Sequence, residues 1–326
     1  MSMIIETQNL TKKFGDFVAN NNINLQVGKQ EIKCIVGENG AGKSTLMNML
    51  YGVLKPSSGK ILVNGEEIVM NSPTDAIRHG IGMVHQHFKL VPSLSVYENI
   101  LLGSEITKRG LIDRRQEIEK VKQLIEEYHF QIDPMEKIQN ISVGLCQQVE
   151  ILKMLYRNVD ILILDEPTAV LTPQEVDQLM ENLKALRDQG KTIIVITHKL
   201  REVMYLSDSV TVIKSGQVIG TVKTRDTNET ELAQMMVGRD VVLTVCNEAG
   251  PAPKAEEAYR VEGVCTVKDA NQEILHNVTL SVRKGEVLGI AGVEGNGQSE
   301  FIKVLTGVMT VTKGKITLNG KAVTNA

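Results

Sequence analysis

Nine consecutive residues have the types and spacing of a phosphate-binding loop. Residues 37–45 form a Gly-x4-Gly-Lys-Ser pattern that follows an apolar run at 32–36 and opens a helical pattern at 46–50. Polyphosphate needs many donors at once, which glycines supply by letting successive backbone N–H groups turn inward at the positive end of a helix. We expect Lys43 to reach the terminal phosphates and Ser44 to ligate magnesium. The predicted phosphate-binding residues are Gly37, Asn39, Gly40, Ala41, Gly42, Lys43, Ser44 and Thr45.

Two carboxylates and a histidine follow apolar runs that are typical of buried parallel strands. The run at 160–164 ends in Asp165 and Glu166, and the run at 192–197 ends in His198. Ligands of parallel sheets gather at the carboxyl ends of the strands. Asp165 is therefore expected where Lys43 and Ser44 would hold magnesium, and His198 is expected at the same edge.

The elements that position these residues follow from the hydrophobic pattern. Residues 4–27 alternate as short strands joined by turns, and residues 59–65 indicate a strand that ends in an Asn-Gly turn. The insert that follows is predicted to be all-helical, with one helix over 96–102, a second capped by Asp113 and a third beginning near Ser142. Phe14 stands in a polar loop, where it could stack on a nucleobase or pack on the sheet.

Composition excludes some classes of protein. The chain has 326 residues, 42% of them hydrophobic, so it can bury a substantial core in more than one domain. A net charge of -3 argues against a nucleic-acid surface. Four widely spaced cysteines without a secretory signal indicate reduced thiols in a cytosolic protein. Because no apolar run reaches membrane-spanning length, any work at a membrane is expected to go through a partner.

Taken together and in this order, these motifs resemble the nucleotide-binding subunits of ABC transporters. The resemblance covers essentially the whole chain and implies an α/β P-loop ATPase core with a parallel sheet, an N-terminal antiparallel β subdomain and a helical insert. It implies that the substrate is ATP with Mg²⁺, that Phe14 stacks on adenine and that Asp165 and Ser44 hold the metal. It further implies that Gln86 senses magnesium and water, that Glu166 is the general base on the attacking water, and that His198 contacts the γ-phosphate.

The resemblance also implies a site shared between two domains. Ser142 and Gly144 would contact the γ-phosphate bound by another domain, arranged head to tail. Three positions depart from the family pattern: the signature reads Ile-Ser-Val-Gly-Leu over 141–145, Gln148 stands where arginine is common, and Thr172 replaces an aspartate. The Ser-Val-Gly and Ala-Val-Leu-Thr-Pro sequences together look like the tandem ATPases that import monosaccharides and nucleosides.

An internal repeat supports that assignment. Gly292 lies 255 residues after Gly37, and Gly320 lies the same distance after Gly65. We therefore expect a first ATPase domain over 1–245, a linker over 246–258 and an incomplete second domain over 259–326. In the second loop Gln298 stands at the lysine position and Glu300 follows the serine, which should weaken phosphate binding there.

Three functions are compatible with the sequence. The first is an ATPase at the cytoplasmic face of the membrane that powers an importer for nucleosides or simple sugars. Its partners would be transmembrane permease subunits, another ATPase domain and, indirectly, an extracytoplasmic solute-binding protein, with no nucleic acid. The alternatives are a soluble, non-transport ABC ATPase and a nucleotide-binding fragment with little intrinsic turnover. The apolar-rich segment 87–95, which follows Gln86, favours docking to a permease.

Overall fold

The computed structural model describes residues 2–86, 88–108, 110–238, 256–268, 272–292 and 296–324. The chain divides into two compact units, Met1–Leu243 and Thr244–Ala326. The expected linker over 246–258 lies outside the described residues except for its last three. The two units are considered separately below.

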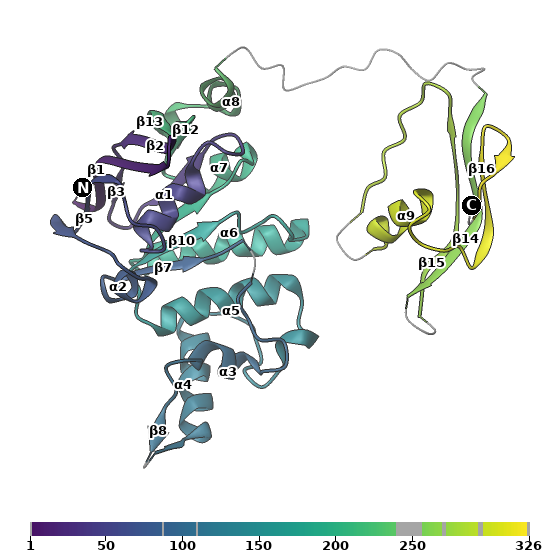
Figure 1. Ribbon diagram of the computed structural model, residues 1–326. Coiled ribbons are helices and arrows are strands. Elements are labelled where there is room, and N and C mark those ends of the chain that lie inside the picture. Colours follow the sequence, from purple (N-terminus) through teal and green to yellow (C-terminus); the bar gives the residue numbers. More distant parts are fainter. Residues whose placement is uncertain are drawn as a thin grey trace. The chain divides into compact units, whose positions relative to one another are not determined.

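A six-stranded, mostly parallel sheet forms the centre of the first unit (Figure 1). Its strand order is β13-β12-β4-β11-β10-β7, and only β13 runs antiparallel to its neighbour. The strands are β4 (Ile32–Val36), β7 (Ile81–Val84), β10 (Ile161–Asp165), β11 (Thr192–Ile196), β12 (Ser209–Lys214) and β13 (Gln217–Lys223).

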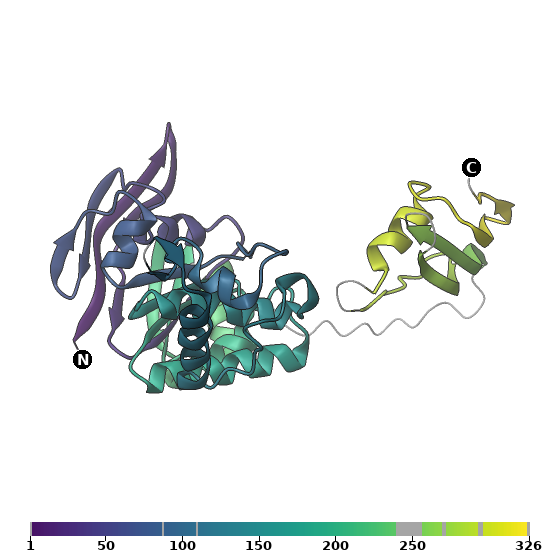
Figure 2. The same ribbon diagram turned by 90° about the horizontal axis from the view of Figure 1, so that it is seen from below.

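An antiparallel sheet at the N-terminus forms a second layer beside it, seen in purple and blue in Figure 2. Its strands are β1 (Met3–Phe14), β2 (Phe17–Ile23), β3 (Gln26–Gly28), β5 (Ser58–Val63) and β6 (Glu66–Ile68). Asn64 and Gly65 both have positive φ, 51° and 84°, between β5 and β6. The predicted Asn-Gly hairpin is therefore confirmed.

Helices cover both faces of the parallel sheet. The helices described in the first unit are α1 (Lys43–Leu50), α2 (Pro73–Arg78), α3 (Val96–Leu101), α4 (Arg114–Glu127), α5 (Val143–Tyr156), α6 (Pro173–Asp188), α7 (Leu200–Leu206) and α8 (Glu229–Val237), with 3₁₀ turns at Ile138–Asn140 and Thr224–Asp226. Of these, α3 and α4 pack on α5 and not on the sheet. Side chains of β10 and β11 alternate between two cores. Ile163 and Ile194 pack with α1, whereas Leu162 and Val195 pack with α5 and α6. Both strands are therefore buried on two faces, which explains their continuously apolar sequences.

The insert between β7 and β10 is mainly but not entirely helical. The Asp113 side chain caps α4 by accepting a hydrogen bond from Gln116 N, as predicted. A helix begins at Ser142 as expected, and the Ser142 side chain caps it by accepting from Leu145 N. The prediction of an all-helical insert was wrong, because β8 (Thr107–Lys108) pairs antiparallel with β9 (Leu111–Ile112), beyond α4 in Figure 1. Two residue pairs are too few to produce an alternating pattern in the sequence.

The second unit repeats the first part of the first unit. Its elements are β14 (Glu257–Lys268), β15 (Gln272–Arg283), α9 (Gln298–Leu305), β16 (Lys313–Leu318) and β17 (Lys321–Ala322). Both α9 and β16 begin and end 255 residues after α1 and β5, so the repeat seen in the sequence is a structural repeat. Residues 287–291, at the same offset from β4, form no strand, and Val287 is 96% exposed. In the first unit β11 and β12 flank β4; no equivalents of them occur among the described residues of the second.

Two expectations from composition can be compared with the structure. Cys34, Cys146 and Cys265 are free thiols, and burial raises the pKa of Cys34 to about 12; Cys246 lies outside the described residues. Over the part of the chain that the structure describes, no helix has the length and apolar character needed to cross a membrane.

The doubly buried β11 should dominate the stability of the first unit. We expect Ile194→Ala to lower its free energy of unfolding by about 2–5 kcal/mol, because Ile194 is fully buried and the cavity can collapse only partly. Leu111→Ala is the control, since Leu111 is 76% exposed and its loss should change stability by no more than about 0.5 kcal/mol. Urea unfolding followed by far-UV circular dichroism measures both. Equal losses for the two variants would contradict this description of the core.

Candidate nucleotide-binding site

The predicted phosphate-binding loop connects β4 to α1, as its sequence indicated. Gly42 forms the N-cap of α1 with φ 97°, and a Cβ atom there would lie 2.5 Å from Ala19 O. A Cβ atom on Gly37 would lie 2.1 Å from Ile213 O. Neighbouring backbone therefore packs against the loop, and these two positions accept no side chain without a shift of the chain.

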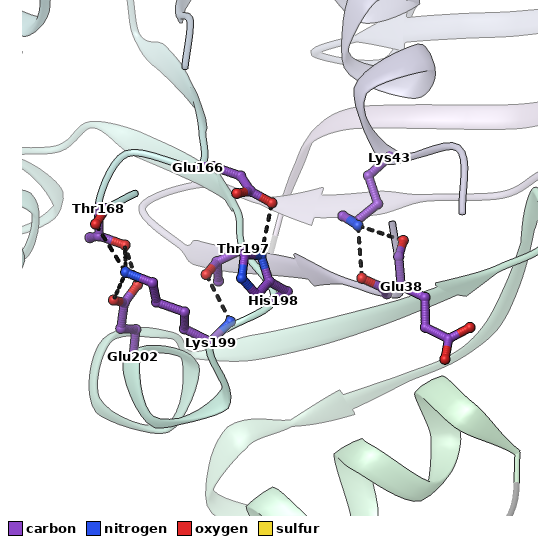
Figure 3. Close-up of polar contacts among 9 residues, drawn as sticks. Glu38, Lys43, Glu166, Thr168, Thr197, His198, Lys199 and Glu202 are labelled. Atoms are coloured by element: carbon purple, nitrogen blue, oxygen red, sulfur yellow. Dashed lines mark hydrogen bonds and ion pairs between the residues drawn. The ribbon is translucent and has the colours of Figure 1, made fainter. Parts of the chain in front are cut away.

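Lys43 lies beneath this loop and is only 6% exposed. Its Nζ donates hydrogen bonds to Gly37 O at 2.7 Å and to Glu38 O at 2.9 Å, as Figure 3 shows. Burial lowers the pKa of the ammonium group, and the charges of Glu166 and Asp165 oppose this effect. The loop carbonyls thus bind a partly desolvated cation at the N-terminus of α1.

Asp165 ends β10 next to the loop. The Ser44 side chain lies near its carboxylate, and both residues line the same cavity. Burial raises the pKa of Asp165, and the nearby Glu166 charge adds to this effect, whereas Ser44 and Lys43 lower it. The expected juxtaposition of Ser44 with Asp165 is therefore present.

Glu166 and His198 meet at the same edge of the sheet. His198 Nδ1 lies 2.9 Å from Glu166 Oε1 (Figure 3). Glu166 has a left-handed backbone, with φ 46°, and its N–H donates to Ile196 O at 2.9 Å. A left-handed conformation is uncommon for a residue other than glycine and often marks a functional position. It directs the carboxylate toward His198.

A polar network behind these two residues joins the loops that carry them. Lys199 Nζ donates to Thr168 O at 2.9 Å and to Thr168 Oγ1 at 3.0 Å, and it lies 3.2 Å from Glu202 Oε1. Thr168 Oγ1 donates to Glu202 Oε2 at 2.7 Å, which closes the ring drawn in Figure 3. Sequence reasoning missed this network, although a lysine directly after His198 was the available signal.

A cavity of about 530 Å³ contains most of the predicted residues. Its lining is Phe17, Ala19, Asn39, Gly40, Ala41, Gly42, Lys43, Ser44, Thr45, Gln86, Asp165 and Glu166. Phe17 lines it and Phe14 does not; Phe14 lies across the β1–β2 hairpin, 47% exposed, with Lys12 Nζ 5.0 Å from its ring centre. Loop N–H groups, a lysine, a hydroxyl and a carboxylate form a donor set that fits a nucleoside triphosphate with Mg²⁺.

The signature residues lie elsewhere. Ser142 and Gly144 are at the start of α5, do not line this cavity, and both contact Glu175. The structure therefore does not bring them together with the phosphate-binding loop of the same unit. Glu175 was not identified from the sequence.

The loop of the second unit differs at the lysine position. A cavity of about 670 Å³ is lined by residues 290–292 and 297–300, whereas residues 293–295 of this loop lie outside the described part. A Cβ atom on Gly292 would lie 2.0 Å from Gln298 Nε2. Gln298 thus folds back over the start of the loop, as Lys43 does on Gly37, but it brings an amide instead of a cation.

Comparison with known proteins identifies the family. The profile of the ABC transporter family matches residues 20–169 and 275–326. The chain belongs to the ABC transporter family. The match includes both phosphate-binding loops and the β10 carboxylates.

Individual relatives support the same family. The chain is 52% identical over its whole length to the guanosine import ATP-binding protein NupO of Bacillus subtilis. It is 47% identical over 99% of its length to the nucleoside import ATP-binding protein NupA of Lactococcus lactis. It spans 63% of the length of each. The crystal structure of the ADP form of MJ1267, an ATP-binding cassette of an ABC transporter, matches 73% of this chain and 100% of its own, with a TM-score of 0.64 and 25% identity.

The raised pKa of Asp165 predicts an unusual stability change. A carboxyl group whose folded-state pKa is raised opposes folding once it ionises, so Asp165→Asn should raise the melting temperature of the nucleotide-free chain near neutral pH. As the pH falls through the raised pKa, the wild-type group protonates and the difference should close. Scanning calorimetry across pH measures this, with the exposed Asp226→Asn as control. A lower melting temperature of Asp165→Asn at neutral pH, or a pH-independent gain, would contradict the account of this carboxylate.

Proposed function

We propose that this chain binds Mg-ATP in the cavity of its first unit and hydrolyses it to power a membrane importer. The observation that carries the proposal is the convergence of Lys43 and Ser44 with Asp165, Glu166 and His198 at one edge of the parallel sheet. Structural networks also place charges near one another, but this set combines a phosphate loop, a metal-type carboxylate and a carboxylate paired with histidine.

Binding depends on charge neutralisation and on backbone donors. Lys43 exchanges the carbonyl oxygens of Gly37 and Glu38 for the terminal phosphates, while the N–H groups of the loop cover the remaining oxygens. Ser44, Asp165 and Gln86 would hold Mg²⁺, which would neutralise charge on the phosphates. The exposed rings of the β1–β2 hairpin suit stacking on adenine; we assign this role to Phe14, with Phe17 at the cavity wall.

Hydrolysis requires one positioned water and one proton acceptor. Glu166 accepts the proton of the attacking water, whose oxygen bonds to the γ-phosphorus as the bond to the β–γ bridging oxygen breaks and ADP leaves. His198, 2.9 Å from the carboxylate, orients Glu166 and contacts the γ-phosphate. Gln86, which lines the cavity, senses the metal and the water.

The complete site includes a second domain. Ser142 and Gly144 of one domain face the γ-phosphate held by Lys43 of another in a head-to-tail arrangement. Their separation from the loop of their own unit supports this assignment. The amide at Gln298 supports one strong nucleotide site per chain, at the loop of the first unit.

The transported solute is inferred from the relatives, and the permease partner is inferred from the segment that follows Gln86. NupO is named for the import of guanosine and NupA for the import of nucleosides. We infer that the importer powered by this chain transports nucleosides or simple sugars. Val91, in the segment after Gln86, exchanges two hydrogen bonds with Asn99, and Lys89 N donates to the buried Glu150. A surface held in this way suits docking to a permease at the cytoplasmic face of the membrane, with a solute-binding protein on the other side.

A second candidate is a nucleotide-binding chain with little turnover of its own. The exposed Val287 and the absence of a strand over 287–291 favour it, because the second unit, as described, offers no second complete site.

Two variants separate binding from hydrolysis. Lys43→Ala should weaken Mg-ATP binding by at least about tenfold, because it removes a charged donor from the ground-state phosphates. Glu166→Gln should keep binding but lower the rate of phosphate release by about 10²–10⁴-fold, because it removes only the proton acceptor. Calorimetry measures the first and a phosphate assay the second. Equal turnover in Glu166→Gln and wild type would exclude Glu166 as the base, and unchanged affinity in Lys43→Ala would exclude this loop as the site.

A further inference from the structure

One carboxylate, that of Glu175, joins the starts of two helices. Glu175 is the third residue of α6, and its Oε2 accepts hydrogen bonds from Thr172 N and Thr172 Oγ1, both at 3.0 Å. Its Oε1 accepts from Ser142 Oγ at 2.9 Å and from Gly144 N at 3.1 Å, at the start of α5. The two oxygens therefore have different tasks: one caps α6 and the other binds the signature residues.

The groups bound by Oε1 are the two donors that the proposed function assigns to phosphate. A hydroxyl and a backbone N–H at the positive end of a 14-residue helix form a set of donors suited to an oxygen anion. Glu175 supplies such an anion from within the same unit. Hydrogen bonds from Thr172, Ser142 and Gly144 lower the pKa of its carboxyl, so it is ionised at neutral pH.

Packing shows how closely this anion occupies the position. A Cβ atom on Gly144 would lie 2.6 Å from Glu175 Oε1, so the carboxylate fills the space that the glycine leaves. No lysine, arginine or histidine forms an ion pair with Glu175 within the described residues. Its negative charge is therefore balanced only by hydrogen bonds and would repel an approaching phosphate.

We propose that Glu175 is an internal competitor for the signature: Oε1 occupies Ser142 and Gly144 while the domains are apart and must release them before another domain's nucleotide docks. This inference rests on the shared site of the proposed function. When Oε1 releases Ser142 and Gly144, the hydrogen bonds from Thr172 to Oε2 remain. The cap of α6 is therefore kept while the start of α5 exchanges the carboxylate for a phosphate. Glu175 then sets the protein concentration at which ATP brings two chains together.

The test is ATP-dependent self-association of the full chain, measured by sedimentation in a Glu166→Gln background so that nucleotide is retained. Glu175→Gln removes the charge and keeps an amide oxygen for Thr172. It should lower the midpoint concentration for association by about tenfold, the effect of replacing a charged acceptor by a neutral one. Glu181→Gln is the matched control, since it removes a 60%-exposed carboxylate of the same helix and should leave the midpoint unchanged.

The outcomes separate this inference from the proposed function. If Ser142→Arg abolishes association but Glu175→Gln leaves its midpoint unchanged or raises it, the shared site stands and the competitor role is overturned. If ATP promotes no association in any variant, or if Ser142→Arg has no effect on association, both the shared site and the competitor role of Glu175 are excluded. Mg-ATP affinity at the Lys43 loop, measured in parallel, should be equal in Glu175→Gln and its parent, which shows that the substitution leaves the fold intact.

Discussion

Parallel pairing of β4, β11 and β10 is the constraint on which the site depends. In this register Ile35 lies beside Ile196, and Ile196 lies beside Asp165. The chain therefore leaves the sheet at one edge in three adjacent places: into the phosphate loop after β4, into Glu166 after β10 and toward His198 after β11. Because both faces of β10 and β11 are buried, a one-residue slip would move side chains between the two cores, so packing fixes the register and hence the site.

The charged and polar groups of the site have partners within the first unit. Lys43 donates to loop carbonyls, and Asp165 lies near Ser44. Glu166 pairs with His198, and the signature residues donate to Glu175. The contact of the buried Lys43 satisfies a charged group that would otherwise be costly to bury, whereas His198 and Ser142 are exposed. In the proposed function, Mg-ATP would supply stronger partners for several of these groups at once. In that case nucleotide binding replaces contacts within the chain by contacts with ATP, and each replacement can be examined with one substitution.

Sequence reasoning succeeded where the signal is local. The Gly-x4-Gly-Lys-Ser loop, the Asp113 cap, the start of α5 at Ser142 and the doubly buried strands all depend on neighbours in the sequence or on a short period, and the structure contains each of them. It missed contacts between distant residues, such as Glu175 with Ser142, 33 positions apart, and Lys199 with Thr168, 31 apart. These contacts depend on how α5, α6 and the loop after β10 pack, which no spacing in the sequence specifies. The β8–β9 pair was missed because it is too short to show a period.

We propose that the ATP site of the first unit becomes active only when the signature of another domain completes it. The most direct measurement is specific ATPase activity over a wide range of protein concentration, for the wild-type chain and for Ser142→Arg. We expect specific activity to rise with concentration and Ser142→Arg to abolish the rise, because the arginine blocks the start of α5 without touching the Lys43 loop. Turnover that is independent of concentration and indifferent to Ser142→Arg would contradict it.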